Sequence, residues 1–98
     1  PDVTTIIFRI EVAKVADNQL EQVANPDLGI WIKDYDILPN QQDRVIGCLK
    51  EIIILASRID CGDKYIHISL TEGMASFRLP PSLLKSISDV GCILEIEV

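Results

Sequence analysis

The chain has 98 residues, of which 48% are hydrophobic and 5% aromatic, and its formal net charge at pH 7 is −6. This length suits a single small packed domain spanning residues 1–98, and the hydrophobic content excludes a disordered chain. The acidic charge would repel nucleic-acid phosphates and anionic lipid, so nucleic acid and membranes are excluded as expected partners.

The cysteines point to a reducing compartment. Cys48, Cys61 and Cys92 are odd in number and show no CxxC spacing. A secreted disulfide framework normally uses an even count, so we expect free thiols in a cytoplasmic protein. No apolar run approaches the roughly 20 residues that a membrane-spanning helix needs.

The first elements along the chain are predicted to be a strand and a short helix. Residues 4–12 alternate between apolar and other side chains, which predicts a strand whose buried face carries Ile6, Phe8, Ile10 and Val12. Residues 18–24 are predicted to form a short helix, because Asp17 can cap it and Asn25-Pro26-Asp27 forms a turn after it.

A second strand and the main helix follow. Residues 29–35 alternate, and we expect Trp31, Lys33 and Tyr35 on the outer face of that strand. Residues 41–59 carry apolar side chains at helical spacing, which predicts a long helix capped by Asn40, with Ile54 near its polar side.

The C-terminal half is predicted to contain a hairpin, a helix and a final strand. Residues 65–70 and 74–79 both alternate and are separated by a glycine-containing connection, which predicts an antiparallel pair. Pro80-Pro81-Ser82 suits the start of a helix, because proline is well tolerated at the first helical position, and Gly91 suits its end. Residues 92–98 again alternate, with Glu95 and Glu97 on one face.

The predicted order is β-α-β-α-β-β-α-β. From the second strand onward it matches the β-α-β-β-α-β unit of the ferredoxin-like fold. We therefore expect an α+β two-layer sandwich with a mainly antiparallel sheet: a ferredoxin-like core preceded by an extra β-α unit, whose strand adds to a sheet edge.

The sequence offers no recognisable catalytic, cofactor or metal site. His67 is the only histidine, and Ser69 on the same strand face lacks the surroundings of a nucleophile. The carboxylates Asp34, Asp36 and Asp43 lack the pattern of a calcium loop, and the isolated glycines form no phosphate-binding loop. We expect no enzyme activity, cofactor or metal.

What remains is a surface suited to binding another protein. Aromatic side chains commonly anchor interfaces, and carboxylates attract basic partners. The predicted partner-binding residues are Trp31, Asp34, Tyr35, Asp36, Asp43 and Tyr65. Filling of the core by Trp31 is an equally good interpretation of that residue.

The C-terminal segment FRLPPSLLKSISDVGCILEIEV carries a strand-helix-glycine-strand pattern, defined by Leu79, Pro81, Leu83, Leu84, Ile87, Gly91, Leu94 and Ile96. This pattern resembles the C-terminal signature of a bacterial family known mainly as a domain of unknown function. Small acidic proteins of this kind resemble toxin-immunity proteins. The resemblance implies neutralisation of a cognate toxin. The acidic charge favours a basic toxin, and we expect the chain to be a monomer or a homodimer.

Two alternatives belong to other functional classes. A ferredoxin-like regulatory domain would bind a small metabolite at a helix–strand or subunit boundary, and such a ligand would raise the melting temperature. A self-assembling structural component would instead pair its edge strands with those of another copy.

Overall fold

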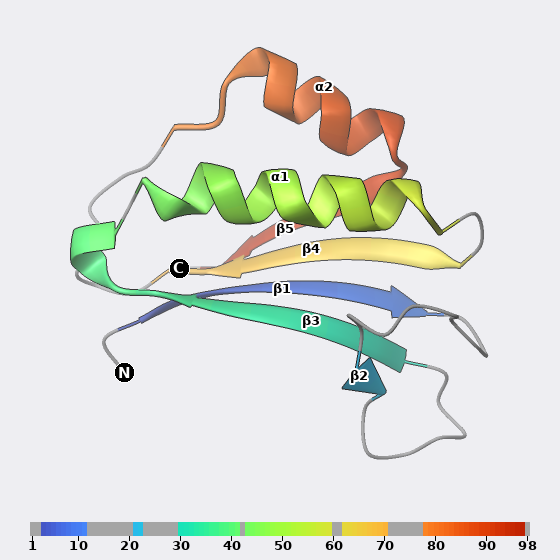
Figure 1. Cartoon of the computed structure of the whole chain (residues 1–98), viewed down its shortest axis with the longest axis horizontal. Helices are drawn as coiled ribbons and strands as arrows, with labels where there is room; N and C mark the ends of the chain where they lie inside the picture. The colour runs from blue at the N-terminus through green and yellow to red at the C-terminus, as the bar shows by residue number, and fades with distance from the viewer. Residues whose placement is uncertain are drawn as a thin grey trace.

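The computed structural model describes residues 3–11, 21–22, 30–41, 43–59, 62–70 and 78–97, with backbone only at 21–22. The elements in this part of the chain are β1 (Thr4–Glu11), β2 (Glu21–Gln22), β3 (Ile30–Ile37), a 3-10 turn (Pro39–Gln41), α1 (Arg44–Ser57), β4 (Asp63–Ser69), α2 (Pro81–Asp89) and β5 (Cys92–Glu97). They form an α+β fold of two layers (Figure 1). Neither described helix is long and apolar enough to cross a membrane.

The described strands form one mixed sheet in the order β2-β3-β1-β4-β5. β1 pairs antiparallel with both β3 and β4, and β3 also pairs antiparallel with the short β2. β4 and β5 are parallel. β3 and β4 therefore run in the same direction on either side of β1.

Both helices cover the same face of the sheet (Figure 1). α1 connects β3 to β4, α2 lies in the chain between β4 and β5, and both connections advance in the same direction across the sheet. Connections between parallel strands share one handedness, so two that advance the same way place their helices on the same side.

The core lies between this covered face and the helices. Ile6, Phe8 and Ile10 of β1 have no exposed surface, which confirms the predicted buried face for these three residues. They pack in one cluster with buried residues of both helices and β4, which include Leu49, Ile52, Ile66, Ile68, Leu83 and Ile87. Burial of each such side chain stabilises the fold by about 1.5 to 3 kcal/mol.

α1 is shorter than predicted at both ends. Residues 39–41 form a 3-10 turn, and Asp43, not Asn40, occupies the N-cap position. The Gln41 side chain accepts hydrogen bonds from the Leu38 amide at 3.3 Å and from Arg44 Nη1 at 3.0 Å, which stabilises the separate turn. Ile54 is 55% exposed, as the helical spacing predicts.

α2 begins and ends where the sequence predicts. Pro81 is its first residue, and the Pro80 carbonyl accepts hydrogen bonds from the amides of Leu83 and Leu84. Gly91 follows the helix with φ of 74°, a left-handed conformation that glycine adopts without steric cost. β5 then starts at Cys92.

Three expectations about topology are wrong. Glu21–Gln22 is a strand, so the helix predicted over residues 18–24 does not include these two residues; the others of that range lie outside the described part. β1 is central, not at an edge. Both edges of β4 are occupied, by β1 and β5, so the predicted antiparallel hairpin partner for β4 is excluded.

The ferredoxin-like order is not confirmed. Of the strand predicted over residues 74–79, residues 74–77 lie outside the described part and residues 78–79 are not in a strand. β4 and β5 instead form a parallel β-α-β unit with α2 between them.

Lys64 connects the sheet to the ends of both helices. It lies on the covered face of β4, opposite Ile10, and its ammonium group donates to the Ala56 carbonyl at 3.2 Å and the Val90 carbonyl at 3.4 Å. These carbonyls belong to the C-terminal ends of α1 and α2, where the helix dipole favours a positive charge.

We expect Lys64→Met to lower the free energy of unfolding by about 1 to 3 kcal/mol, because it keeps the apolar stem but leaves two part-buried carbonyls without their charged donor. Chemical denaturation measures the effect. Lys85→Met is the matched control: its exposed ion pair with Asp89 at 2.9 Å should contribute less than about 1 kcal/mol. Equal losses in the two variants would contradict the role given to Lys64.

Candidate functional site

The candidate site is the face of the sheet that α1 and α2 do not cover. The strand register places every second residue on it, and we call this set the open face. It comprises Thr5, Ile7, Arg9 and Glu11 of β1; Ile30, Ile32, Asp34 and Asp36 of β3; Asp63, Tyr65, His67 and Ser69 of β4; and Ile93, Glu95 and Glu97 of β5.

Negative charge dominates the open face. Six carboxylates and a single arginine, Arg9, lie among its described residues. Toward the C-terminal ends of β3 and β5, Asp34 and Asp36 form one acidic column, and Glu95 and Glu97 form a second. Three strand spacings, about 14 Å, separate the columns.

The strip between the acidic columns is uncharged apart from a histidine. Thr5 and Ile7 of β1 lie beside Ser69 and His67 of β4, and all four side chains are half-buried. Next to this strip, one row across the sheet runs through Ile32, Arg9, Tyr65 and Ile93. Ile93, at the β5 end of that row, is 54% exposed.

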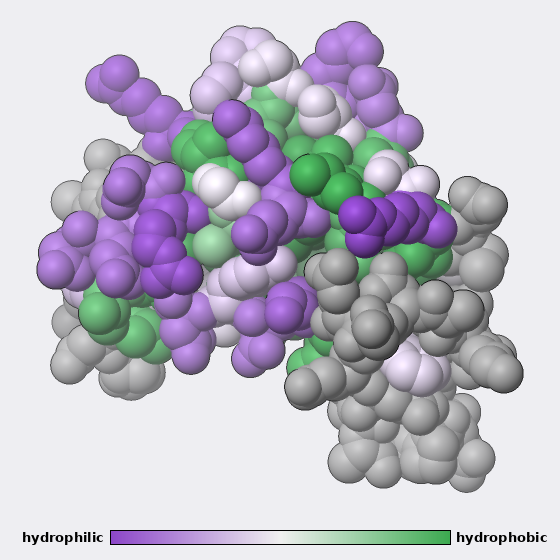
Figure 2. Space-filling model, viewed as in Figure 1, coloured by the Kyte–Doolittle hydropathy of each residue, from purple (hydrophilic) through white to green (hydrophobic). Residues whose placement is uncertain are grey.

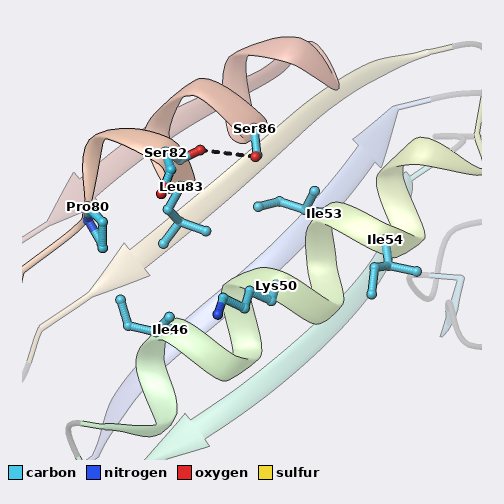
Figure 3. A pocket seen from close by; sticks show the side chains of 8 residues that line it. All are labelled: Ile46, Lys50, Ile53, Ile54, Pro80, Ser82, Leu83 and Ser86. Carbon is cyan, nitrogen blue, oxygen red and sulfur yellow. Dashed lines mark hydrogen bonds between the residues drawn. The ribbon is translucent and has the colours of Figure 1, made fainter.

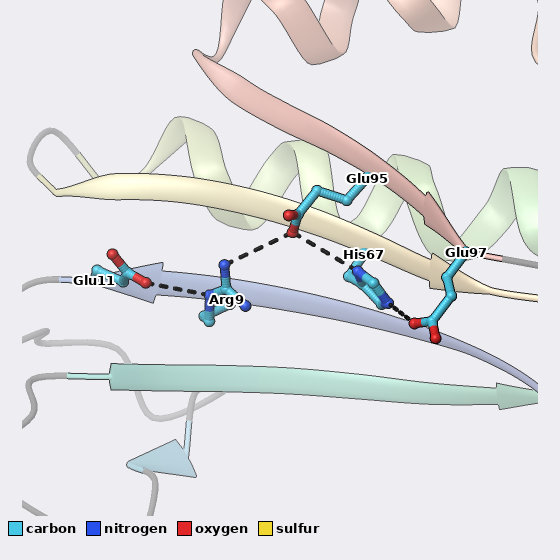
Figure 4. A network of polar contacts seen from close by, with 5 residues as sticks. All are labelled: Arg9, Glu11, His67, Glu95 and Glu97. Carbon is cyan, nitrogen blue, oxygen red and sulfur yellow. Dashed lines mark hydrogen bonds and ion pairs between the residues drawn. The ribbon is translucent and has the colours of Figure 1, made fainter.

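A polar network joins β1, β4 and β5 on the open face (Figure 4). One oxygen of Glu95 lies 3.7 Å from both Arg9 Nη2 and His67 Nδ1. His67 Nε2 lies 3.0 Å from a Glu97 oxygen. Because an ionised carboxylate only accepts hydrogen bonds, the N–H group at Nε2 is the donor of this one. Both ring nitrogens therefore face carboxylates and not the Ser69 hydroxyl.

Arg9 is held in place from two more sides. Its Nε lies 3.5 Å from Glu11, and its guanidinium carbon lies 4.4 Å from the centroid of the Tyr65 ring. The contacts with Glu11 and Glu95 are longer than ordinary hydrogen bonds, and Arg9 Nε and the inner Glu95 oxygen have no hydrogen-bond partner among the described residues.

Charge on the helix side has the opposite sign. Among the described residues of α1, α2 and the segments that flank them, the basic side chains are Arg44, Lys50, Arg58, Arg78 and Lys85, and the acidic ones are Asp43, Glu51 and Asp89. The covered face of the sheet adds Lys33 and Lys64. Counted over the residues that the structure describes, the two layers of the fold are therefore oppositely charged.

The structure divides the six predicted partner-binding residues. Asp34, Asp36 and Tyr65 lie together on the open face, where one partner could contact all three. Trp31 and Tyr35 lie on the covered face and pack against the core, so the expectation that they point outward is wrong. Asp43 lies at the start of α1, away from the others.

Four residues of the polar network were not among the predicted partner-binding residues: Arg9, His67, Glu95 and Glu97. The alternation of β5 already places Glu95 and Glu97 on one face. The missing information was the parallel pairing of β5 with β4, which brings these carboxylates beside His67.

The two described cysteines are poorly suited to act as nucleophiles. Burial raises the pKa of the Cys48 and Cys92 thiols, which favours the less nucleophilic protonated form. Among the residues that the structure describes, no three His, Cys, Asp or Glu side chains gather as metal ligands would.

No family model, curated protein or solved structure matches the chain.

The placement of Tyr35 can be tested by titration. Burial, together with the neighbouring Glu51 carboxylate, raises the pKa of Tyr35 to about 12. The chain has two tyrosines, so in a Tyr65→Phe variant the tyrosinate absorbance reports Tyr35 alone. We expect ionisation near pH 12; ionisation close to the ordinary value of 10 would contradict its position against the core.

The same shift predicts a pH dependence of stability. Because the folded-state pKa of Tyr35 lies above its unfolded-state value, its contribution is complete below pH 10 and is lost as the pH rises toward about 12. Denaturation of the wild type and of Tyr35→Phe across this range measures it. The wild type should lose more stability than the variant, and parallel losses would contradict the prediction.

Proposed function

We propose that the chain is a protein-binding module whose open face docks on a basic surface of a partner protein, as expected of an immunity protein that neutralises a toxin. The observation that carries this proposal is the separation of charge between the two layers. Negative charge collects on the face that the helices leave uncovered, where a partner can approach the sheet.

The open face combines the features that protein interfaces use. Two acidic columns about 14 Å apart can steer a basic partner and fix its orientation. Between and beside them lie less polar groups, which include Ile7, Ile32 and Ile93. Tyr65 and Arg9, already stacked on each other, belong to the residue types that most often dominate binding energy.

The first partner to test is a toxic protein encoded beside the gene for this chain. Co-expression of the wild-type chain should relieve growth inhibition by that neighbour. Purified proteins should associate with a rate constant that falls as salt is added, because salt screens the attraction between the open face and the partner. A neighbour whose toxicity is not relieved, or a genomic neighbourhood with no toxic protein, would contradict the immunity role.

Charge reversal at one acidic column tests which surface binds. Asp34→Lys/Asp36→Lys changes two exposed side chains of β3, and we expect the association rate constant at low salt to fall at least about tenfold. Asp43→Lys/Asp89→Lys is the matched control, since it changes the net charge equally on the helix side. Similar rate constants for the two variants would exclude the open face as the binding surface.

A further inference from the structure

A hollow opens between the two helices, on the opposite layer from the open face. It has a volume of about 390 Å³, within the size range of small-molecule sites. Ile46 and Ile53 of α1 and Pro80 and Leu83 at the start of α2 line it. Figure 3 shows Ile53 and Leu83 pointing into the space between the helices. We call this hollow the helix groove.

The helix groove is apolar, with a cation beside it. Lys50 lies on α1 between Ile46 and Ile53 and also lines the groove (Figure 3). Its ammonium group forms no ion pair with any described residue, whereas Lys85 on α2 is paired with Asp89. In Figure 2, hydrophobic side chains emerge in the band between the helices, among hydrophilic ones.

The α2 side of the groove adds no charged group among the described residues that line it. The Ser86 hydroxyl donates to the Ser82 carbonyl at 3.0 Å, so it is satisfied within the helix. No described carboxylate lines the groove. Among the described residues of the groove, a ligand would therefore meet mainly apolar walls and one positive charge without an ion pair, Lys50.

We infer that the helix groove binds a small apolar carboxylic acid, with the hydrocarbon chain between Ile53 and Leu83 and the carboxylate beside the Lys50 ammonium. The apolar stretch from Ile46 to Ile53 is about 10 Å long. With a volume of about 390 Å³, the groove suits a short hydrocarbon chain. The site goes beyond the proposed protein-binding role and does not depend on it.

The expected affinity has one contribution from the hydrocarbon chain and another from the charged head group. Each buried methylene should improve affinity by up to about fourfold, so octanoate should bind more tightly than hexanoate. The exposed ammonium should favour a carboxylate by about two- to fivefold, because ion pairs in water are weak. Chain length should therefore dominate affinity, and Lys50 should determine the preference for the charged head group.

Amide NMR titrations with octanoate, octanol and octylamine, below their micellar concentrations, test the site. We expect octanoate to shift the amides of residues 46–54 and 82–86 and to bind more tightly than octylamine. Lys50→Gln should weaken octanoate binding about two- to fivefold and leave octanol binding unchanged. Lys85→Gln, the control outside the groove, should change neither.

A second variant tests the groove itself. Ser86→Leu places a larger side chain, well tolerated in helices, on the α2 wall and should abolish binding of both octanoate and octanol. Its amide spectrum without ligand shows whether the fold is kept. Shifts confined to other residues, equal binding of octanoate and octylamine, or binding unaffected by Ser86→Leu in a folded variant would overturn the assignment. A shift of the same amides only by an acidic peptide would favour a protein ligand and also overturn it.

Discussion

The architecture depends on the position of β1 at the centre of the sheet. β1 is antiparallel to both neighbours, so β3 and β4 are parallel to each other and cannot be joined by a tight hairpin. The crossover that connects them is α1, which must pass over one face of β1. Because α2 follows in the same direction, both helices pack over the same face of the sheet as the core, and no described element covers the other face.

That geometry explains why the charges separate. Alternate residues of each strand point to opposite faces of the sheet. The strand pairing places the carboxylates of β3, β4 and β5 on the same face as Arg9, which is the face that the helices do not cover. A carboxylate on the covered face would lose its hydration within the core, at a cost of several kcal/mol. The lysines found there have long stems: Lys64 reaches the helix-end carbonyls, and Lys33 lies 5.7 Å from the Tyr35 ring centroid.

The sequence was informative wherever one face of an element was clearly apolar. The alternation of β1, the stripe of α1 and the Pro81 and Gly91 signals of α2 identified these elements closely. The buried face of β3 was harder to predict, because both faces carry apolar side chains: Ile30 and Ile32 on one, Trp31 and Tyr35 on the other. Only pairing with β1 decides which face is covered. Strand order depends on such long-range pairing, so neither the central place of β1 nor the meeting of Glu95 with His67 was readable from local patterns.

The two proposed surfaces lie on opposite sides of the core and can act without interfering. Lys50 and the acidic columns face solvent on opposite layers, so their charges interact mainly through water, where the Debye length at physiological ionic strength is about 8 Å. The charge of an acid beside Lys50 would therefore be largely screened from a partner on the acidic columns. Any coupling between the two sites would have to pass through the core between the helices and the sheet, whose closely packed side chains leave little room for adjustment. We therefore expect substitutions in the helix groove to leave the affinity of the open face unchanged, and substitutions on the open face to leave binding in the groove unchanged.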